Sequence, residues 1–85
     1  MGRAKRLRVS RLPEKLLQIR TSLNLSQNQL IRKLGYEDVI RQSSVSEYES
    51  GHREPPLPIL LAYARLANIS VEILIDDELK LPEAK

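Results

Sequence analysis

The chain has 85 residues, a formal net charge of +3 and no cysteine. This length fits one domain with a modest core, and the lack of cysteine excludes a disulfide framework and a thiolate metal site. No apolar run approaches the roughly eighteen residues of a membrane span, and the N-terminal residues include no apolar signal segment. We therefore expect a cytoplasmic protein that needs no metal and no cofactor.

Charge is distributed unevenly along the chain. Residues 1–11 carry no acid, whereas residues 72–85 carry more acids than bases. The basic residues of the first segment are Arg3, Lys5, Arg6, Arg8 and Arg11. We expect a flexible basic arm at 1–11, a domain at 12–76 and a short acidic tail at 77–85. The arm is a ready contact for a polyanion, although a solvated tail that aids solubility would have the same composition.

Two helices are expected in the first half of the domain. The first begins at Pro13, because a residue without an N–H loses nothing at the start of a helix. It ends at Asn24, which tolerates a left-handed backbone. The second helix covers residues 27–34 and opens with a capping box, in which Ser26 and Gln29 exchange side-chain and backbone hydrogen bonds.

A third helix is expected to end at Gly51, since glycine adopts the left-handed conformation that stops a helix. Val45 and Tyr48 lie three residues apart and provide its apolar face. Its start is open: Asp38 could cap a helix that begins at Val39, the helix could begin at Gln42, or Ser44 and Glu47 could form the capping box of a shorter helix. We expect a start between Val39 and Gln42.

Two further helices are expected after a rigid link at residues 53–56, where each proline pushes its predecessor toward an extended backbone. The fourth covers residues 58–67 and ends at Asn68. The fifth is short, at residues 71–75, and the chain from Asp76 onward is expected to be irregular. No alternating apolar pattern indicates strands, so the fold class is all-α.

Four segments stand in a characteristic order: Leu25-Ser26-Gln27, Leu34-Gly35, Val-Ser-x-Tyr-Glu-x-Gly-x-Arg-x-Pro at residues 45–55, and Asn-Ile-Ser-Val-Glu-Ile-Leu at residues 68–74. In these segments the chain resembles the lambda-repressor-like (Cro-type, xenobiotic-response-element) helix-turn-helix family, over roughly residues 13–76. The resemblance implies a five-helix DNA-binding domain whose third helix enters the major groove. One departure is the loop before this helix: fifteen residues separate Gly35 from Gly51, about four more than in the family pattern.

The resemblance implies which residues read bases. The matched positions lie at the front of the third helix and are Gln42, Ser43, Ser44 and Glu47. Glutamine can make two hydrogen bonds to adenine, and serine can bond to several bases. A carboxylate at Glu47 could accept from a cytosine amino group, or it could pair with a basic neighbour and touch no base.

Phosphate contacts are expected around the third helix, because the first turn of the second helix and the turn after Gly51 flank it. In its first-turn position, Gln27 is expected to turn its amide and the nearby backbone N–H groups outward. Ser46 could instead face the neighbouring helix. The full set of expected phosphate contacts is Gln27, Arg41, Ser46, Ser50, His52, Arg53, Arg3, Lys5, Arg6 and Arg8. Such contacts position a protein on the duplex without reading its sequence.

Arg20 and Glu49 match two members of an ion pair that joins the first and third helices in this family. A bidentate pair of this kind fixes geometry more than it adds stability. The alternative is two separate surface charges, which would contribute little.

We expect sequence-specific binding of double-stranded DNA and transcriptional repression by operator occupancy. A homodimer would read a pseudo-palindromic operator. The candidate dimer residues, which could instead belong to the core or to the packed tail, are Ile73, Ile75, Leu79 and Leu81.

Two alternatives remain for the partner. The same fold could serve as an antitoxin or interaction adaptor, with a toxin or regulator docking on the acidic tail. RNA binding is the less favoured alternative, because the chain has three tyrosines and no phenylalanine or tryptophan, which leaves few side chains on which bases could stack. The chain has no glycine-rich phosphate loop and no nucleophile with an evident base, so we expect no enzymatic activity.

Overall fold

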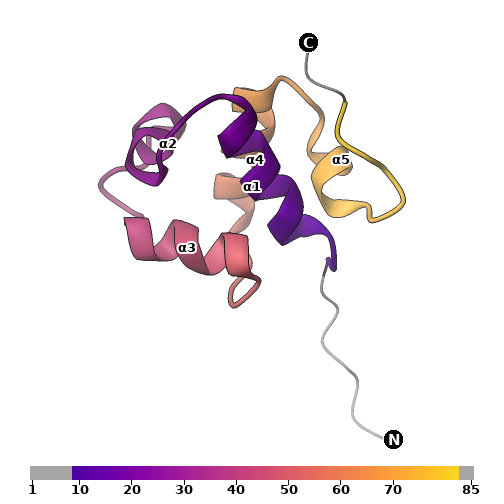
Figure 1. Ribbon diagram of the computed structural model, residues 1–85, viewed down its shortest axis with the longest axis horizontal. Coiled ribbons are helices and arrows are strands. Elements are labelled where there is room, and N and C mark those ends of the chain that lie inside the picture. The colour runs from indigo at the N-terminus through magenta and orange to yellow at the C-terminus, as the bar shows by residue number, and fades with distance from the viewer. Residues whose placement is uncertain (1–8, 83–85) are drawn as a thin grey trace, which may run out of the picture.

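The computed structural model describes residues 9–82, which form five helices and, within that range, no strand. The helices are α1 (Leu12–Ser22), α2 (Gln27–Leu34), α3 (Gln42–Ser50), α4 (Leu57–Ala67) and α5 (Val71–Ile75). Figure 1 shows α1 and α4 in the middle of the molecule, α2 and α3 on one side and α5 on the other. The prediction of an all-α, five-helix fold is confirmed; α1 and α4 begin one residue earlier than expected, and α1 ends at Ser22, two residues before Asn24. No helix in the described part is long and apolar enough to cross a bilayer.

Local signals end the helices as the sequence predicted. Within residues 9–82, the residues with a left-handed backbone are Asn24, Gly35, Gly51 and Asn68, with φ angles of 58°, 80°, 84° and 59°. The capping box of α2 is formed: the Gln29 N–H donates to Ser26 Oγ at 3.1 Å, and the Ser26 N–H donates to Gln29 Oε1 at 2.8 Å. These bonds satisfy two of the N–H groups that an isolated helix start leaves unpaired.

Among the possible starts of α3, the observed one is Gln42, which lies within the expected range. Arg41 is the N-cap residue and has an extended backbone, and its N–H donates to Ser44 Oγ at 3.3 Å. The loop before it forms a turn in which the Val39 and Ile40 N–H groups donate to the Tyr36 carbonyl at 2.9 and 3.0 Å. Ile40 is buried in the core. The extra residues of this loop are therefore held by an apolar anchor rather than added to the helix.

A single core joins all five helices. Its buried side chains are Leu12, Leu16, Ile19, Leu30, Ile31, Leu34, Ile40, Val45, Tyr48, Ile59, Leu60, Tyr63, Ala64 and Leu74. Leu23 is exposed, because α1 ends at Ser22 and the chain turns away there. In α5 the fully buried residue is Leu74, whereas Ile73 is half-buried and Ile75 is exposed.

The segment after α5 is irregular, as expected, but it is folded back onto α1. Leu81 packs against the core, and Leu79 is among the exposed large apolar residues. Lys15 is only 4% exposed, and its ammonium donates to the carbonyls of Ile73 at 2.7 Å and Asp76 at 3.0 Å. Its charge is thereby placed at the C-terminal end of α5, where the helix dipole favours a cation.

Candidate nucleic-acid interface

α3 lies along an outer edge of the molecule and packs against α1 and α2 (Figure 1). Val45 and Tyr48 point into the core, which fixes the rotation of the helix about its axis. Side chains spaced four and then three residues apart share one face of a helix. Ser43, Glu47 and Ser50 are spaced in this way, opposite the buried pair, so this stripe faces solvent.

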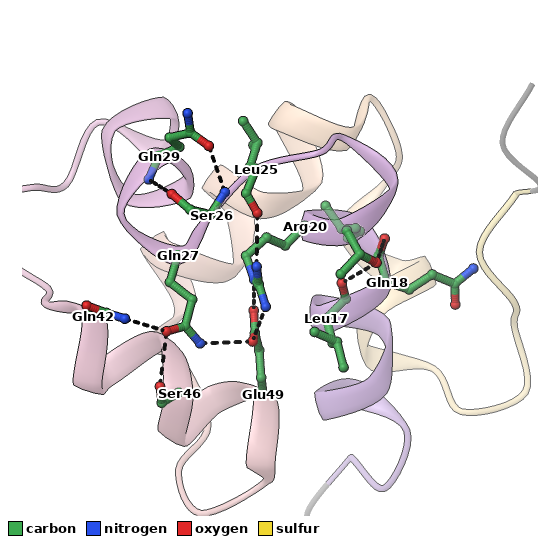
Figure 2. Close-up of polar contacts among 12 residues, drawn as sticks. Leu17, Gln18, Arg20, Leu25, Ser26, Gln27, Gln29, Gln42, Ser46 and Glu49 are labelled. Carbon is green, nitrogen blue, oxygen red and sulfur yellow. Dashed lines mark hydrogen bonds and ion pairs between the residues drawn. The ribbon is translucent and has the colours of Figure 1, made fainter.

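A second stripe of α3 is bound to the side chain of Gln27 on α2 (Figure 2). The Gln27 Oε1 accepts from Gln42 Nε2 at 3.1 Å and from Ser46 Oγ at 3.2 Å, and its Nε2 donates to Glu49 Oε1 at 3.2 Å. The expectation of an outward amide at Gln27 is wrong in this structure, because three polar groups of α3 converge on it. Ser46 faces the neighbouring helix, which is one of the two positions that the sequence left open.

The backbone at the start of α2 keeps the character expected of an anion site. The capping box uses the N–H groups of Ser26 and Gln29. Among the described residues, no protein acceptor takes the N–H groups of Gln27 and Asn28. These two donors stand at the positive end of the α2 dipole, beside the front of α3.

Arg20 and Glu49 meet as an ion pair that links α1 to α3 (Figure 2). Arg20 Nε donates to Glu49 Oε2 at 2.7 Å and Nη2 donates to Oε1 at 3.1 Å, while Nη1 donates to the Leu25 carbonyl at 2.9 Å. The side chains are 17% and 8% exposed, so solvent screens them little. The hydrogen bond to Glu49 raises the pKa of Arg20 above its ordinary value. The arginine therefore fixes the end of α1, the link to α2 and the last turn of α3 at one point.

Glu47 is paired with a cation on the opposite, outer side of α3. Its Oε1 accepts from Arg53 Nη1 at 2.9 Å, and both side chains are well exposed. Ser50 donates to the Glu47 carbonyl at 3.2 Å, and its hydroxyl lies 2.6 Å from His52 Nδ1. The turn after α3 thus presents an imidazole and a guanidinium next to the outward stripe.

The remaining predicted site residues differ in exposure, and some of them lie outside the described residues. Arg41 is exposed at the start of α3 next to the exposed Gln42, whereas Ser44 is half-buried and turns its hydroxyl back to the Arg41 N–H. Four predicted phosphate contacts of the arm, Arg3, Lys5, Arg6 and Arg8, lie outside the described residues. Within residues 9–82 no group of three or more His, Cys, Asp or Glu side chains is arranged to hold a metal ion.

The charge balance of α3 depends on its neighbours. The helix itself contains two acids and no base. Arg20 neutralises one carboxylate and Arg53 neutralises the other. An unpaired acid on this edge would repel a polyanion, so the two arginines leave a surface of neutral amides and hydroxyls flanked by cations.

The chain matches the helix-turn-helix family over residues 16–74. A curated relative, described as the uncharacterized HTH-type transcriptional regulator YobD of Bacillus subtilis (strain 168), is 36% identical over 62 residues. That alignment covers 73% of this chain and 52% of the relative, so the chain spans about half the length of that protein. No solved structure matches the chain.

Proposed function

The chain belongs to the lambda-repressor-like helix-turn-helix family, and from this premise we propose that it binds double-stranded DNA sequence-specifically and represses transcription by occupying an operator. The observation that carries the proposal is the exposed, charge-neutralised edge formed by α3. The relative's description as a transcriptional regulator also supports a role in the regulation of transcription.

The dimensions of α3 suit the major groove. An α-helix with its side chains is about 10–12 Å in diameter, and the major groove is about 12 Å wide. Val45 and Tyr48 bury one side of the helix, so Ser43 and Glu47 are left on the opposite side, which would meet base edges. The exposed Gln42 lies at the front of the helix beside α2. All three carry groups that can form hydrogen bonds with bases.

Gln42 keeps the polar groups that a contact with adenine would need. One N–H of its amide donates to Gln27, which leaves the second N–H and the carbonyl oxygen available. One donor and one acceptor are what a bidentate contact with adenine N7 and N6 requires. Because Gln27 is itself bound by Ser46 and Glu49, the amide of Gln42 is ordered before DNA arrives.

Phosphate anchoring would come from both ends of α3. The N–H groups of Gln27 and Asn28, together with Arg41, lie at its front, and His52 and Arg53 lie just beyond its end. The two groups of donors stand on either side of the base-reading stripe, as a groove flanked by two phosphate backbones demands.

Affinity and specificity would come from a homodimer. Leu57 is 78% exposed, and it lines one groove together with the exposed Ile75. Apolar side chains gathered in this way suit a two-fold interface, with half-sites about 34 Å apart on one face of the duplex.

The test is selection of bound sequences from random duplex DNA, repeated at two salt concentrations. We expect an enriched, two-fold symmetric motif, and Gln42→Ala should relax the base preference at one position in each half-site. A steep salt dependence without any motif would contradict sequence-specific binding, and an asymmetric short motif would contradict the dimer.

A further inference from the structure

A groove separates the outer face of α2 from the loop that leads into α3. Figure 1 shows this loop at the outer edge of the molecule. Ile31 and Ile40 line the groove and are buried, so its base is apolar. The exposed side chains of its walls are all polar or charged, and they are Asn28, Arg32, Glu37, Arg41 and Gln42. The groove therefore suits a polar or charged ligand that approaches from solvent.

Each wall of the groove contributes one arginine. Arg32 comes from α2 and Arg41 from the N-cap position of α3, and neither forms an ion pair among the described residues. Glu37, the acid of the groove, has no ion pair within residues 9–82 either. Two cations against one acid leave a net positive charge, and the planar guanidinium group matches two oxygens of a phosphate. The groove therefore favours an oxyanion.

The groove adjoins the proposed base-reading surface. Gln42 lines it and is also the residue proposed to contact adenine. Asn28 lines it from the first turn of α2, and no protein acceptor in the described part of the chain takes its backbone N–H. Arg32 is one turn further along α2, at a distance of about 6 Å along the helix axis. A DNA strand that borders the front of α3 and the start of α2 would therefore continue over the groove.

We propose that this groove binds a phosphodiester of DNA next to the bases read by α3, with Arg32 as a phosphate contact that acts together with Arg41. The inference rests on the proposed DNA binding and adds to it a contact beyond the first turn of α2. Arg32 is exposed, and within residues 9–82 its side chain makes no hydrogen bond or ion pair that the phosphate would have to break. Such a contact positions the chain on the duplex without reading its sequence.

The chain supplies a matched control on the same helix. Lys33 is the next residue, is also exposed, and lines a different groove, between α2 and α4. It has the same charge as Arg32 and, like it, no ion pair in the part of the chain that the structure describes. Arg32→Gln and Lys33→Gln therefore reduce the long-range attraction of DNA by similar amounts. Only Arg32→Gln removes a cation from the groove.

The first experiment measures the affinity of the full chain for its selected duplex and for a random duplex at several salt concentrations. We expect Arg32→Gln to weaken both by roughly threefold to tenfold at low salt and to reduce the slope of log affinity against log salt by about 0.9, the value for one phosphate. Lys33→Gln should change either affinity by less than about twofold and leave the slope unchanged. The same loss and the same change of slope in both variants would overturn the inference.

Two further variants test the charge of the groove. Arg32→Lys keeps the cation but loses the bidentate geometry, so it should retain the salt slope of the wild type. Glu37→Gln removes the acid of the groove and should strengthen binding to both duplexes by roughly twofold to threefold. An Arg32→Lys variant with the reduced slope of Arg32→Gln, or a Glu37→Gln variant with unchanged affinity, would contradict a phosphate in this groove.

Neutral phosphates locate the contact on the DNA. A methylphosphonate, which carries no charge, replaces one phosphate of the selected duplex at a time. At one position in each half-site, beside the bases whose preference depends on Gln42, the resulting loss of affinity should be smaller for Arg32→Gln than for the wild type or Lys33→Gln. If the loss is the same for all three proteins at every position, no phosphate contacts Arg32 and the inference fails.

Thermal denaturation checks that the variants are folded. Arg32→Gln and Lys33→Gln should have similar midpoints, because both side chains are exposed and unpaired among the described residues. A clearly lower midpoint for Arg32→Gln would assign Arg32 a structural role and overturn the inference. If the wild type does not bind duplex DNA, the proposed function fails and the inference with it. If the wild type binds and Arg32→Gln behaves like Lys33→Gln, only the inference fails.

Discussion

The two carboxylates of α3 face similar partners in different surroundings. Glu49 and Arg20 are mostly buried and form two hydrogen bonds, whereas Glu47 and Arg53 are exposed and form one. Breaking a buried pair leaves a desolvated charge alone, whereas an exposed pair is largely replaced by water and ions. The buried pair should therefore govern folding, and the exposed pair should govern contact with DNA.

Glu49→Gln is expected to lower the free energy of unfolding by about 1–3 kcal/mol, because a charge-assisted bidentate contact is lost beside a largely buried arginine. Glu47→Gln makes the same chemical change at the exposed site and should cost less than about 0.5 kcal/mol. Thermal denaturation at neutral pH compares the two. Equal thermal midpoints for Glu49→Gln and Glu47→Gln would show that the buried pair does not hold α1 and α3 together. The same conclusion would follow if Glu49→Gln and Arg20→Lys both left stability and DNA binding unchanged.

The Glu47–Arg53 pair leads to a prediction about binding. Glu47→Gln removes an acid from the groove-facing stripe and releases Arg53, so binding to random duplex should strengthen by roughly twofold to fivefold. Arg53→Gln should weaken binding to all sequences and reduce the slope of log affinity against log salt by about one. Titrations at several salt concentrations measure both. A weaker random-duplex affinity for Glu47→Gln would contradict this role.

At the scale of elements, the helix ends are specified by residues that tolerate a left-handed backbone. Gly35 closes α2 with φ of 80°, and nothing lies within 4 Å of a Cβ atom added there. The requirement at this position is therefore conformational and not steric. Asn24 and Asn68 meet the same requirement after α1 and α4, because asparagine accepts this backbone more readily than other non-glycine residues.

A pair of substitutions at Gly35 tests this explanation. Gly35→Ala should cost about 1–2 kcal/mol of unfolding free energy, because alanine is strained in the left-handed region. Gly35→Asn introduces a larger side chain into open space and should cost clearly less. Urea denaturation provides the comparison. If asparagine is as costly as alanine, backbone strain is not what determines this helix end.

At the scale of the whole molecule, the first and last described helices are connected through Lys15 and Asp77. These contacts join residues 58 to 67 positions apart. The connection closes the domain around its core and places the start of α1 next to the turn after α3. The acidic tail expected from the sequence is, in its first residues, part of this closure.

The closure should depend on pH in a defined direction. The N–H groups of Arg11 and Ser10 hold the pKa of Asp77 below its ordinary value of 3.8. Its contribution to stability is therefore complete above that value and is lost as pH falls through the lowered pKa. The amide resonances of Ser10 and Arg11 should shift together below pH 3.8 while those of the core helices stay constant. They should not titrate in Asp77→Asn, and a transition above the ordinary value would contradict the assignment.

Much of this protein follows from short-range signals in the sequence. The capping box at Ser26, the left-handed stops and the apolar spacing of α3 each involve residues within a few positions, so local backbone energetics decide them. The outward stripe of Ser43 and Glu47 follows from the same helical spacing once Val45 and Tyr48 are buried. The start of α3 could not be decided locally, because the burial of Ile40 in a core built from all five helices holds the preceding loop.

The contacts that span the chain were decided only by the tertiary structure. Nothing near Lys15 indicates burial, and its carbonyl partners lie at the end of α5. Asp77 looks like any acid of a solvated tail until the fold brings it to α1, and the amide of Gln27 turns inward only because α3 presents three partners to it. Secondary structure depends on interactions along the chain, whereas the direction of a polar side chain depends on which partners the packed helices bring within hydrogen-bonding distance.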